Sequence, residues 1–146
     1  MVTKSKPVTP KKTVLIVEDS QAQLLAMASW IESLGLKAIC ASNGVEGFFL
    51  ARKHTPDLAI LDVFLPDMSG IQICYILKQD PKTSQIPIVV LTAHPRKDLR
   101  EESLETAGAV EFVPKDNFTE MVLSQLLVKL NLIEELKPED RRERRD

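Results

Sequence analysis

Four short strand-like segments of this chain each lead to a side chain that can take part in chemistry. A carboxylate at the end of a buried strand carries a desolvation cost, which is tolerable where a charge partner or a reaction compensates it. One such residue would be a helix cap or an ion-pair partner, whereas several at equivalent positions indicate a site. The segments 14–17, 58–61, 88–91 and 110–113 lead, respectively, to Glu18 and Asp19, to Asp62, to Thr92 and, after Pro114, to Lys115.

The residue types at these segment ends are those of magnesium-dependent phosphoryl chemistry. Carboxylates brought together raise one another's pKa unless a cation lies between them. An oxygen-only set without His or Cys favours a hard divalent ion, and a half-open set suits Mg²⁺ better than Ca²⁺. Lys115 and Thr92 add a positive charge and a hydroxyl donor, which suit a phosphoryl group. Asp62, at the end of the expected central strand, is the best candidate for a nucleophile that forms an aspartyl phosphate.

Strand-like and helix-like segments alternate from residue 13 onward. The strand-like segments are short, rich in branched residues and apolar on both faces, as in a parallel sheet covered on both sides. The helix-like segments carry apolar stripes and end at Gly or Pro. We expect strands at 13–17, 37–40, 58–62, 88–91 and 110–113. We expect helices between Ser20 and Gly35, at 45–52, 71–79 and 95–107, and from about 117 through Leu136.

This alternation predicts an α/β fold, a flavodoxin-like doubly wound parallel sheet of five strands in the order 2-1-3-4-5, with five helices. In such folds, ligands bind at the carboxyl ends of the strands, beside the switch point between strands 1 and 3. The predicted topology therefore brings the acids, Thr92 and Lys115 to one edge of the sheet.

Composition excludes several classes of function. The chain has 146 residues, enough for one domain with a core. A formal net charge of −2 gives no support to direct nucleic-acid binding. No apolar run is long enough to span a bilayer, and the N-terminus lacks the apolar core of a signal peptide. Cys40 and Cys74 stand singly, as buried thiols of a reducing compartment do, so we expect a cytoplasmic protein.

Four motifs, in this order and at these strand ends, resemble one known family. They are Val-Glu-Asp-Ser at 17–20, Asp-Val-Phe-Leu-Pro-Asp-Met-Ser-Gly at 62–70, Leu-Thr-Ala at 91–93 and Gly-Ala-Val-Glu-Phe-Val-Pro-Lys at 108–115. Together they resemble the receiver domain of two-component response regulators, particularly the single-domain type to which chemotaxis regulators belong. The resemblance covers most of the chain.

The resemblance implies a role for each acidic position. Asp62 would accept a phosphoryl group from a phosphohistidine on a histidine kinase or histidine phosphotransfer protein. Glu18, Asp19 and Asp62 would hold Mg²⁺, together with the backbone carbonyl of Phe64.

The resemblance also implies a switch. Thr92 would bond a phosphoryl oxygen, and Lys115 would pair with the phosphoryl group. Thr92 would move toward that group, and Phe112, at the aromatic switch position, would turn inward into the vacated space. The face of helix 4, strand 5 and helix 5 would then change its affinity for a downstream protein or for a second copy of the chain.

The chain departs from the family pattern beside the site. The family lysine is usually followed by proline through a cis peptide, whereas Lys115 is followed by Asp116. A cis bond without proline costs about 3–4 kcal/mol. Pro114 nonetheless keeps the preceding residue extended and so directs Lys115 past the strand end.

A second departure concerns the residues that flank the site, which are Phe64, Ala93 and His94. Phe64 lies two residues after Asp62, and His94 lies two residues after Thr92. In the family these two positions flank the path of hydrolytic water. Our hypothesis is that the bulky pair slows the loss of phosphate.

We expect a disordered basic arm at 1–12, the receiver domain at 13–131, and an extension of the last helix with a charged tail at 132–146. The extension either folds back on the body as an extra turn or forms a surface for a partner or a second copy. No segment after the last helix is long enough for an output module, so we expect a signalling protein that acts through protein partners and is not an enzyme.

Two alternatives remain. One is a pseudo-receiver that binds partners without being phosphorylated. The other is a phosphohydrolase of the haloacid dehalogenase type, whose motif requires a second Asp where this chain has Phe64.

Overall fold

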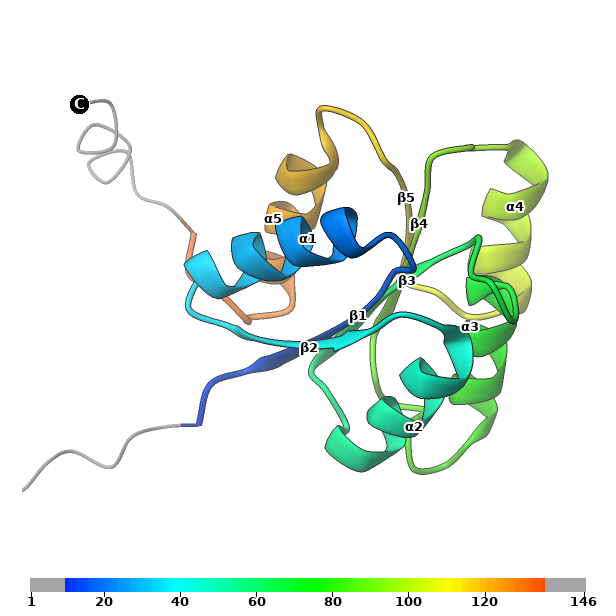
Figure 1. Cartoon of the computed structure of the whole chain (residues 1–146), viewed down its shortest axis with the longest axis horizontal. Helices are drawn as coiled ribbons and strands as arrows, with labels where there is room; N and C mark the ends of the chain where they lie inside the picture. Colours follow the sequence, from blue (N-terminus) through cyan, green and yellow to red (C-terminus); the bar gives the residue numbers. More distant parts are fainter. Residues whose placement is uncertain (1–9, 136–146) are drawn as a thin grey trace, which may run out of the picture.

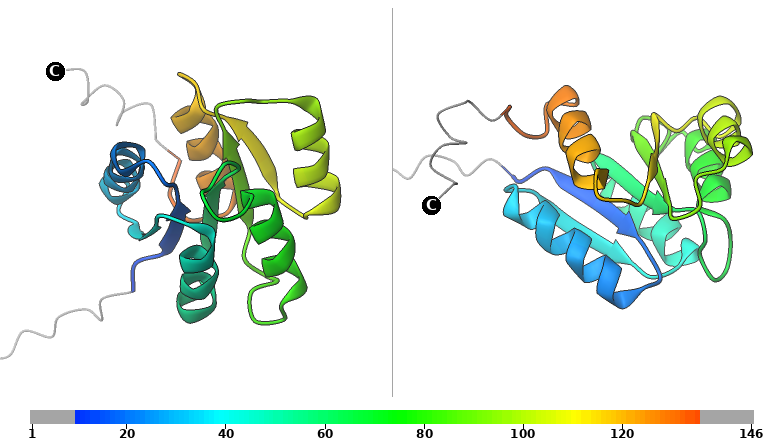
Figure 2. Two further views of the ribbon diagram at one scale, coloured as in Figure 1. Left: turned by 45° about the vertical axis from the view of Figure 1, so that its right-hand side comes forward. Right: turned by 90° about the horizontal axis from the view of Figure 1, so that it is seen from above.

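The computed structural model describes residues 10–135 as a five-stranded parallel sheet covered by helices on both faces (Figures 1 and 2). The strand order is β2-β1-β3-β4-β5. The predicted fold class and strand order are therefore confirmed. The strands are β1 (Thr13–Val17), β2 (Lys37–Ala41), β3 (Leu58–Asp62), β4 (Ile88–Thr92) and β5 (Glu111–Pro114). The helices are α1 (Gln21–Ser33), α2 (Gly44–His54), α3 (Gly70–Gln79), α4 (Lys97–Glu101), its π-helical continuation η1 (Glu102–Thr106), and α5 (Thr119–Lys129).

Two apolar cores, one on each face, hold the helices against the sheet. Figure 2 shows α1 and α5 on one face and α2, α3 and α4 on the other. Every residue of β3 and β4 is buried, as expected for inner strands of a doubly covered sheet. Leu15, Leu61 and Leu77 belong to the core under α2 and α3, and Ile16, Ile60 and Leu127 belong to the core under α1 and α5.

The fourth helix differs from the prediction in its start and in its form. It begins at Lys97 rather than Pro95, because Arg96 is still extended. Its second half is π-helical, and the N–H of Ala107 donates to the carbonyl of Glu102, five residues earlier. The buried hydroxyl of Ser103 donates to the carbonyl of Leu99 at 2.7 Å. Such bonds back to the preceding turn compete with the regular ladder and bend helices.

The expected continuation of the last helix through Leu132 and Ile133 is wrong. The helix ends at Lys129, and Asn131 takes a left-handed conformation with φ of 61°. Asn tolerates this conformation at a helix end better than most residues do. The chain then folds back, so that Leu132 and Ile133 pack on the core under α1 and α5.

Some predictions concern residues that lie outside the described range. These are most of the basic arm, residues 1–9, and most of the charged tail, residues 136–146. Among residues 10–135, no helix is long and apolar enough to cross a membrane.

Candidate functional site

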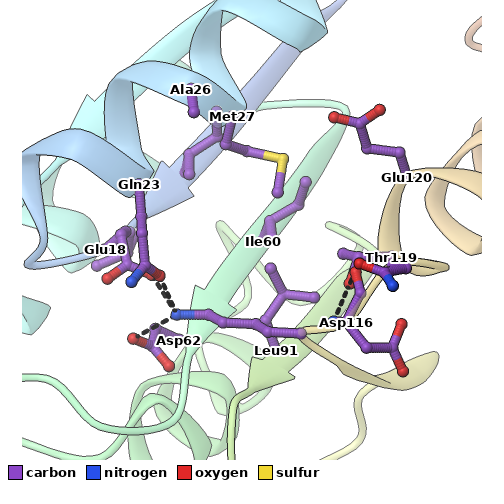
Figure 3. Close-up of a pocket in the computed structure, with 14 residues that line it drawn as sticks. Glu18, Gln23, Ala26, Met27, Ile60, Asp62, Leu91, Asp116, Thr119 and Glu120 are labelled. Carbon is purple, nitrogen blue, oxygen red and sulfur yellow. Dashed lines mark hydrogen bonds and ion pairs between the residues drawn. The ribbon is translucent and has the colours of Figure 1, made fainter.

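The strand ends bring the predicted acids and the lysine together. Because β1, β3 and β4 are parallel neighbours, their carboxyl ends lie at one edge of the sheet. Val17 pairs with Leu61, and Asp62 pairs with Leu91. Glu18 follows directly after β1, and Lys115 follows directly after β5. Figure 3 shows Glu18 and Asp62 facing each other at this edge.

The ammonium of Lys115 is the centre of a polar cluster. Its Nζ lies 2.6 Å from Oε2 of Glu18 and 3.1 Å from Oδ2 of Asp62. It also donates to Oε1 of Gln23 at 2.9 Å. Gln23 was not predicted. Its signal in the sequence is its place three residues after Ser20, whose side chain caps α1 and accepts from the N–H of Gln23.

Burial shapes the acid–base properties of this cluster. Asp62 and Glu18 are each only 6% exposed. Burial raises the pKa of Asp62, Lys115 opposes this and Glu18 adds to it, so that the pKa of Asp62 lies above its ordinary value. For Lys115, burial lowers the pKa, but the bonds to Glu18 and Asp62 outweigh it and raise the pKa overall. The surroundings therefore disfavour the ionised form of Asp62 and favour the charged form of Lys115.

The carboxylates fit a hard divalent ion. One oxygen each from Glu18, Asp19 and Asp62 lie within 4.8 Å of one another. Glu18 and Asp62 are buried, whereas Asp19 is exposed. This combination of buried and solvent-facing oxygens suits Mg²⁺, which keeps several waters when bound to proteins.

The loop after Asp62 is folded tightly against the strand. The N–H of Gly70 donates to the carbonyl of Val63 at 2.9 Å, and Phe64 forms a β-bridge with Ser69. A Cβ at Gly70 would lie 2.0 Å from the backbone oxygen of Asp62. Only glycine permits this approach, which explains the Gly at the end of the 62–70 motif.

Thr92 is placed differently from the charged residues. It is fully buried, and its Oγ1 accepts from the N–H of His94 at 3.0 Å. Its carbonyl accepts from the N–H of Lys115 at 2.8 Å. Among residues 10–135, the hydroxyl of Thr92 has no hydrogen bond to Asp62 or Lys115. The structure thus holds Thr92 at the same edge but outside the polar cluster.

The flanking residues form an aromatic pair. The rings of Phe64 and His94 meet edge to face, with centroids 5.7 Å apart. Phe64 is 50% exposed, and both Ala93 and His94 are exposed. The pair therefore lies on the solvent side of the site, between the loops after β3 and β4.

Phe112 is already inside the protein. The side chain is 4% exposed and belongs to the core under α2 and α3. The peptide between Lys115 and Asp116 is trans, since residues 10–135 contain no cis peptide bond. The hydroxyl of Thr119 bonds the carbonyls of Pro114 and Asp116 at 2.7 and 3.0 Å, which orders the loop without the family's proline.

A cavity of about 480 Å³ opens from the cluster into the space between α1 and α5. Met27, Ile60 and Leu91 contribute apolar surface to it. Figure 3 shows Glu18, Gln23 and Asp62 at one end and Asp116, Thr119 and Glu120 on the opposite side. Asp62 therefore lies at one end of this cavity.

Comparison with known proteins agrees with this geometry. The polar-differentiation response regulator DivK of Brucella anthropi is 36% identical over 104 residues, which are 71% of this chain and 84% of that protein. The chemotaxis protein CheY4 of Vibrio cholerae superposes with a TM-score of 0.73 at 25% identity, covering 80% of this chain and 97% of that one. A CheY-like receiver domain protein from Methanospirillum hungatei JF-1 shares the fold, with a TM-score of 0.76 at 24% identity over 92% of this chain and 99% of that one.

The family model for the response regulator receiver domain matches residues 14–127, which include each carboxylate of the cluster and Lys115. The chain therefore belongs to the receiver domain family of two-component response regulators.

Proposed function

We propose that this protein accepts a phosphoryl group on Asp62 from a phosphohistidine on a histidine kinase or phosphotransfer protein. An oxygen of Asp62 attacks phosphorus, the P–N bond to the donor imidazole breaks, and the imidazole leaves with a proton from solvent. The observation that carries the proposal is the buried carboxylate of Asp62 at the end of β3, with Lys115 at 3.1 Å and two further acids beside it.

Each neighbour of Asp62 has a part in this proposal. Glu18, Asp19 and the backbone carbonyl of Phe64 would hold Mg²⁺ with Asp62, and the ion would supply charge neutralisation at the phosphoryl oxygens. Lys115 pairs with a phosphoryl oxygen after exchanging one of its carboxylate partners. Thr92 bonds another oxygen by turning its hydroxyl away from the N–H of His94.

The output is a change in protein binding. Movement of Thr92 alters the packing around Phe112, and the face of helix 4, strand 5 and helix 5 changes its affinity for a downstream protein or a second copy. Because Phe112 is already buried, we expect the ring to stay inside and its neighbours to shift around it. The protein acts as a cytoplasmic signalling protein, whose reactions are phosphoryl transfer to its own Asp62 and autodephosphorylation.

The test uses a small phosphodonor. The protein is incubated with acetyl phosphate and Mg²⁺, and its intact mass is measured with and without chelator. We expect one phosphoryl adduct that is absent from Asp62→Asn and absent after chelation. A folded protein that gains no adduct at any donor concentration would instead be a pseudo-receiver that binds partners without phosphorylation.

A further inference from the structure

The N-terminus of α2 is capped from two sides. The first backbone N–H groups of a helix have no partner within the helix. Asn43 caps locally, since its Oδ1 accepts from the N–H of Glu46 at 2.9 Å. Asp67, more than twenty residues later in the chain, accepts from the N–H of Gly44 at 2.8 Å and of Val45 at 2.9 Å, one with each carboxylate oxygen.

Asp67 belongs to the loop that follows the phosphoacceptor. The two N–H groups of α2 lower the pKa of Asp67, so the carboxylate is ionised at neutral pH. The neighbouring Met68 packs against the same helix end, where a Cβ at Gly44 would lie 2.4 Å from Cγ of Met68. The centre of the loop is therefore fastened to α2.

The loop has further contacts at its two ends and through one apolar side chain. Gly70 fixes the far end against the carbonyls of Asp62 and Val63. Phe64 has one backbone pairing, the bridge to Ser69, and its side chain is half-exposed. Between Phe64 and Ser69, Leu65 packs on the core under α2 and α3, and Asp67 makes the hydrogen bonds that join the loop to the backbone of α2.

We propose that Asp67 is a positioning residue for the divalent-ion site, which holds the backbone carbonyl of Phe64 in place by fastening its loop to the N-terminus of α2. The inference rests on the proposed function, because it takes Phe64 as a ligand of that ion. Groups that orient metal ligands change the affinity for the metal by about 10- to 100-fold when they are removed.

The test compares two caps of the same helix. Asp67→Ala removes the cap that belongs to the loop, whereas Asn43→Ala removes the local cap and leaves the loop contacts intact. The dissociation constant for Mg²⁺ is measured by calorimetric titration of the unphosphorylated protein. We expect Asp67→Ala to weaken Mg²⁺ binding about tenfold and Asn43→Ala to leave it within about twofold of wild type. Asp67→Asn, which keeps one acceptor oxygen, should lie between them.

Thermal unfolding separates positioning from helix stability. Both Ala variants should lower the melting temperature, since each removes a helix cap. Equal weakening of Mg²⁺ binding in both would show that α2 stability alone matters, and no weakening in Asp67→Ala would refute the role of Asp67. Because these titrations involve no phosphodonor, they give an answer even if Asp62 is never phosphorylated. At saturating Mg²⁺, Asp67→Ala should recover the phosphorylation rate of the wild type.

Discussion

At the scale of single residues, the proposed phosphoacceptor Asp62 lies in surroundings that disfavour its ionisation. Burial and the neighbouring Glu18 both raise the pKa of Asp62, and Lys115 opposes them only partly. A divalent ion would reverse this balance, because a nearby opposite charge favours the ionised carboxylate. The free energy needed to ionise Asp62 therefore reduces the affinity of the site for the ion.

Asp62→Asn should stabilise the protein in the absence of Mg²⁺. The folded-state pKa of Asp62 lies above its unfolded value, so the cost of ionising it is absent at low pH and grows as pH rises through the folded pKa. At neutral pH we expect the melting temperature of Asp62→Asn to exceed that of the wild type, by about 2–4 °C for each kcal/mol gained.

The pH and ion dependence of this difference provide the controls. The advantage of Asp62→Asn should shrink as pH falls through the folded-state pKa of Asp62 and disappear below its unfolded-state pKa, where the side chain is neutral in both states. Mg²⁺ should raise the melting temperature of the wild type more than that of the variant. A variant that is less stable than wild type at neutral pH would contradict the assigned direction of the pKa.

Phe64 and His94 should prolong the phosphorylated state. Their rings meet edge to face on the solvent side of the site, where we expect them to restrict the approach of water. Phe64→Asn and His94→Ala should each shorten the lifetime of the phosphorylated protein several-fold, measured by intact mass after removal of the donor. Because the rings act as a pair, the double variant should lose less than the product of the two single effects. Unchanged lifetimes of the phosphorylated variants would refute the hypothesis that the pair slows the loss of phosphate.

The chemistry of the site was predictable from residue types because parallel strands deliver their ends to one edge. Asp62, Glu18 and Lys115 each follow an apolar segment directly, and the spacing along the chain does not matter once the topology is known. Gln23 and Asp67 escaped prediction for a common reason. Their roles depend on contacts with groups on other elements, namely an ammonium and two backbone N–H groups, which leave no periodic pattern in the sequence.

At the scale of elements, α2 ends under backbone strain. Thr55 has φ of 40° and lies in the left-handed region, where a branched Cβ is unfavourable. Thr55→Gly should therefore stabilise the protein by about 0.5–1 kcal/mol, less than the full relief because Gly also gains freedom in the unfolded chain. Urea unfolding measures the difference. Thr55→Ala keeps a Cβ and should bring little gain, so an equal gain from both would contradict the strain.

The strands matched the prediction more closely than the ends of the helices. A buried strand such as β3 is marked by continuous apolar residues and ends where a charge begins. In the fourth helix, the bond of Ser103 to Leu99 and the π-helical turn depend on packing against α3 and β5, which local propensity does not contain. Likewise, the sequence around Asn131 does not mark a helix end. The helix ends there because Leu132 and Ile133 pack on the core, which requires the left-handed conformation of Asn131.

At the scale of the whole molecule, the segment after α5 closes the core under α1 and α5. Leu132 and Ile133 are partly buried there, whereas Glu134 and Glu135 are exposed. Leu132→Ser and Ile133→Ser should each lower the free energy of unfolding by about 1–2 kcal/mol, as expected for partial loss of a buried aliphatic side chain. Glu134→Ser is the matched control and should change it by less than about 0.5 kcal/mol. Unfolding in urea gives both values, and equal effects at Leu132 and Glu134 would contradict the packing.

The position of Asp62 within β3 has a consequence for how a signal leaves the site. Each residue of this central strand is buried, and the N–H of Val63 still bonds the carbonyl of Leu91, so the hydrogen-bond ladder continues past the acceptor. Amide protons in such a ladder exchange with solvent only through the rarest openings of a protein. A phosphoryl group on Asp62 would thus be carried on a fully buried and hydrogen-bonded part of the backbone. Any rearrangement must travel outward through the side chains and loops that touch it, while the strand itself serves as a fixed reference.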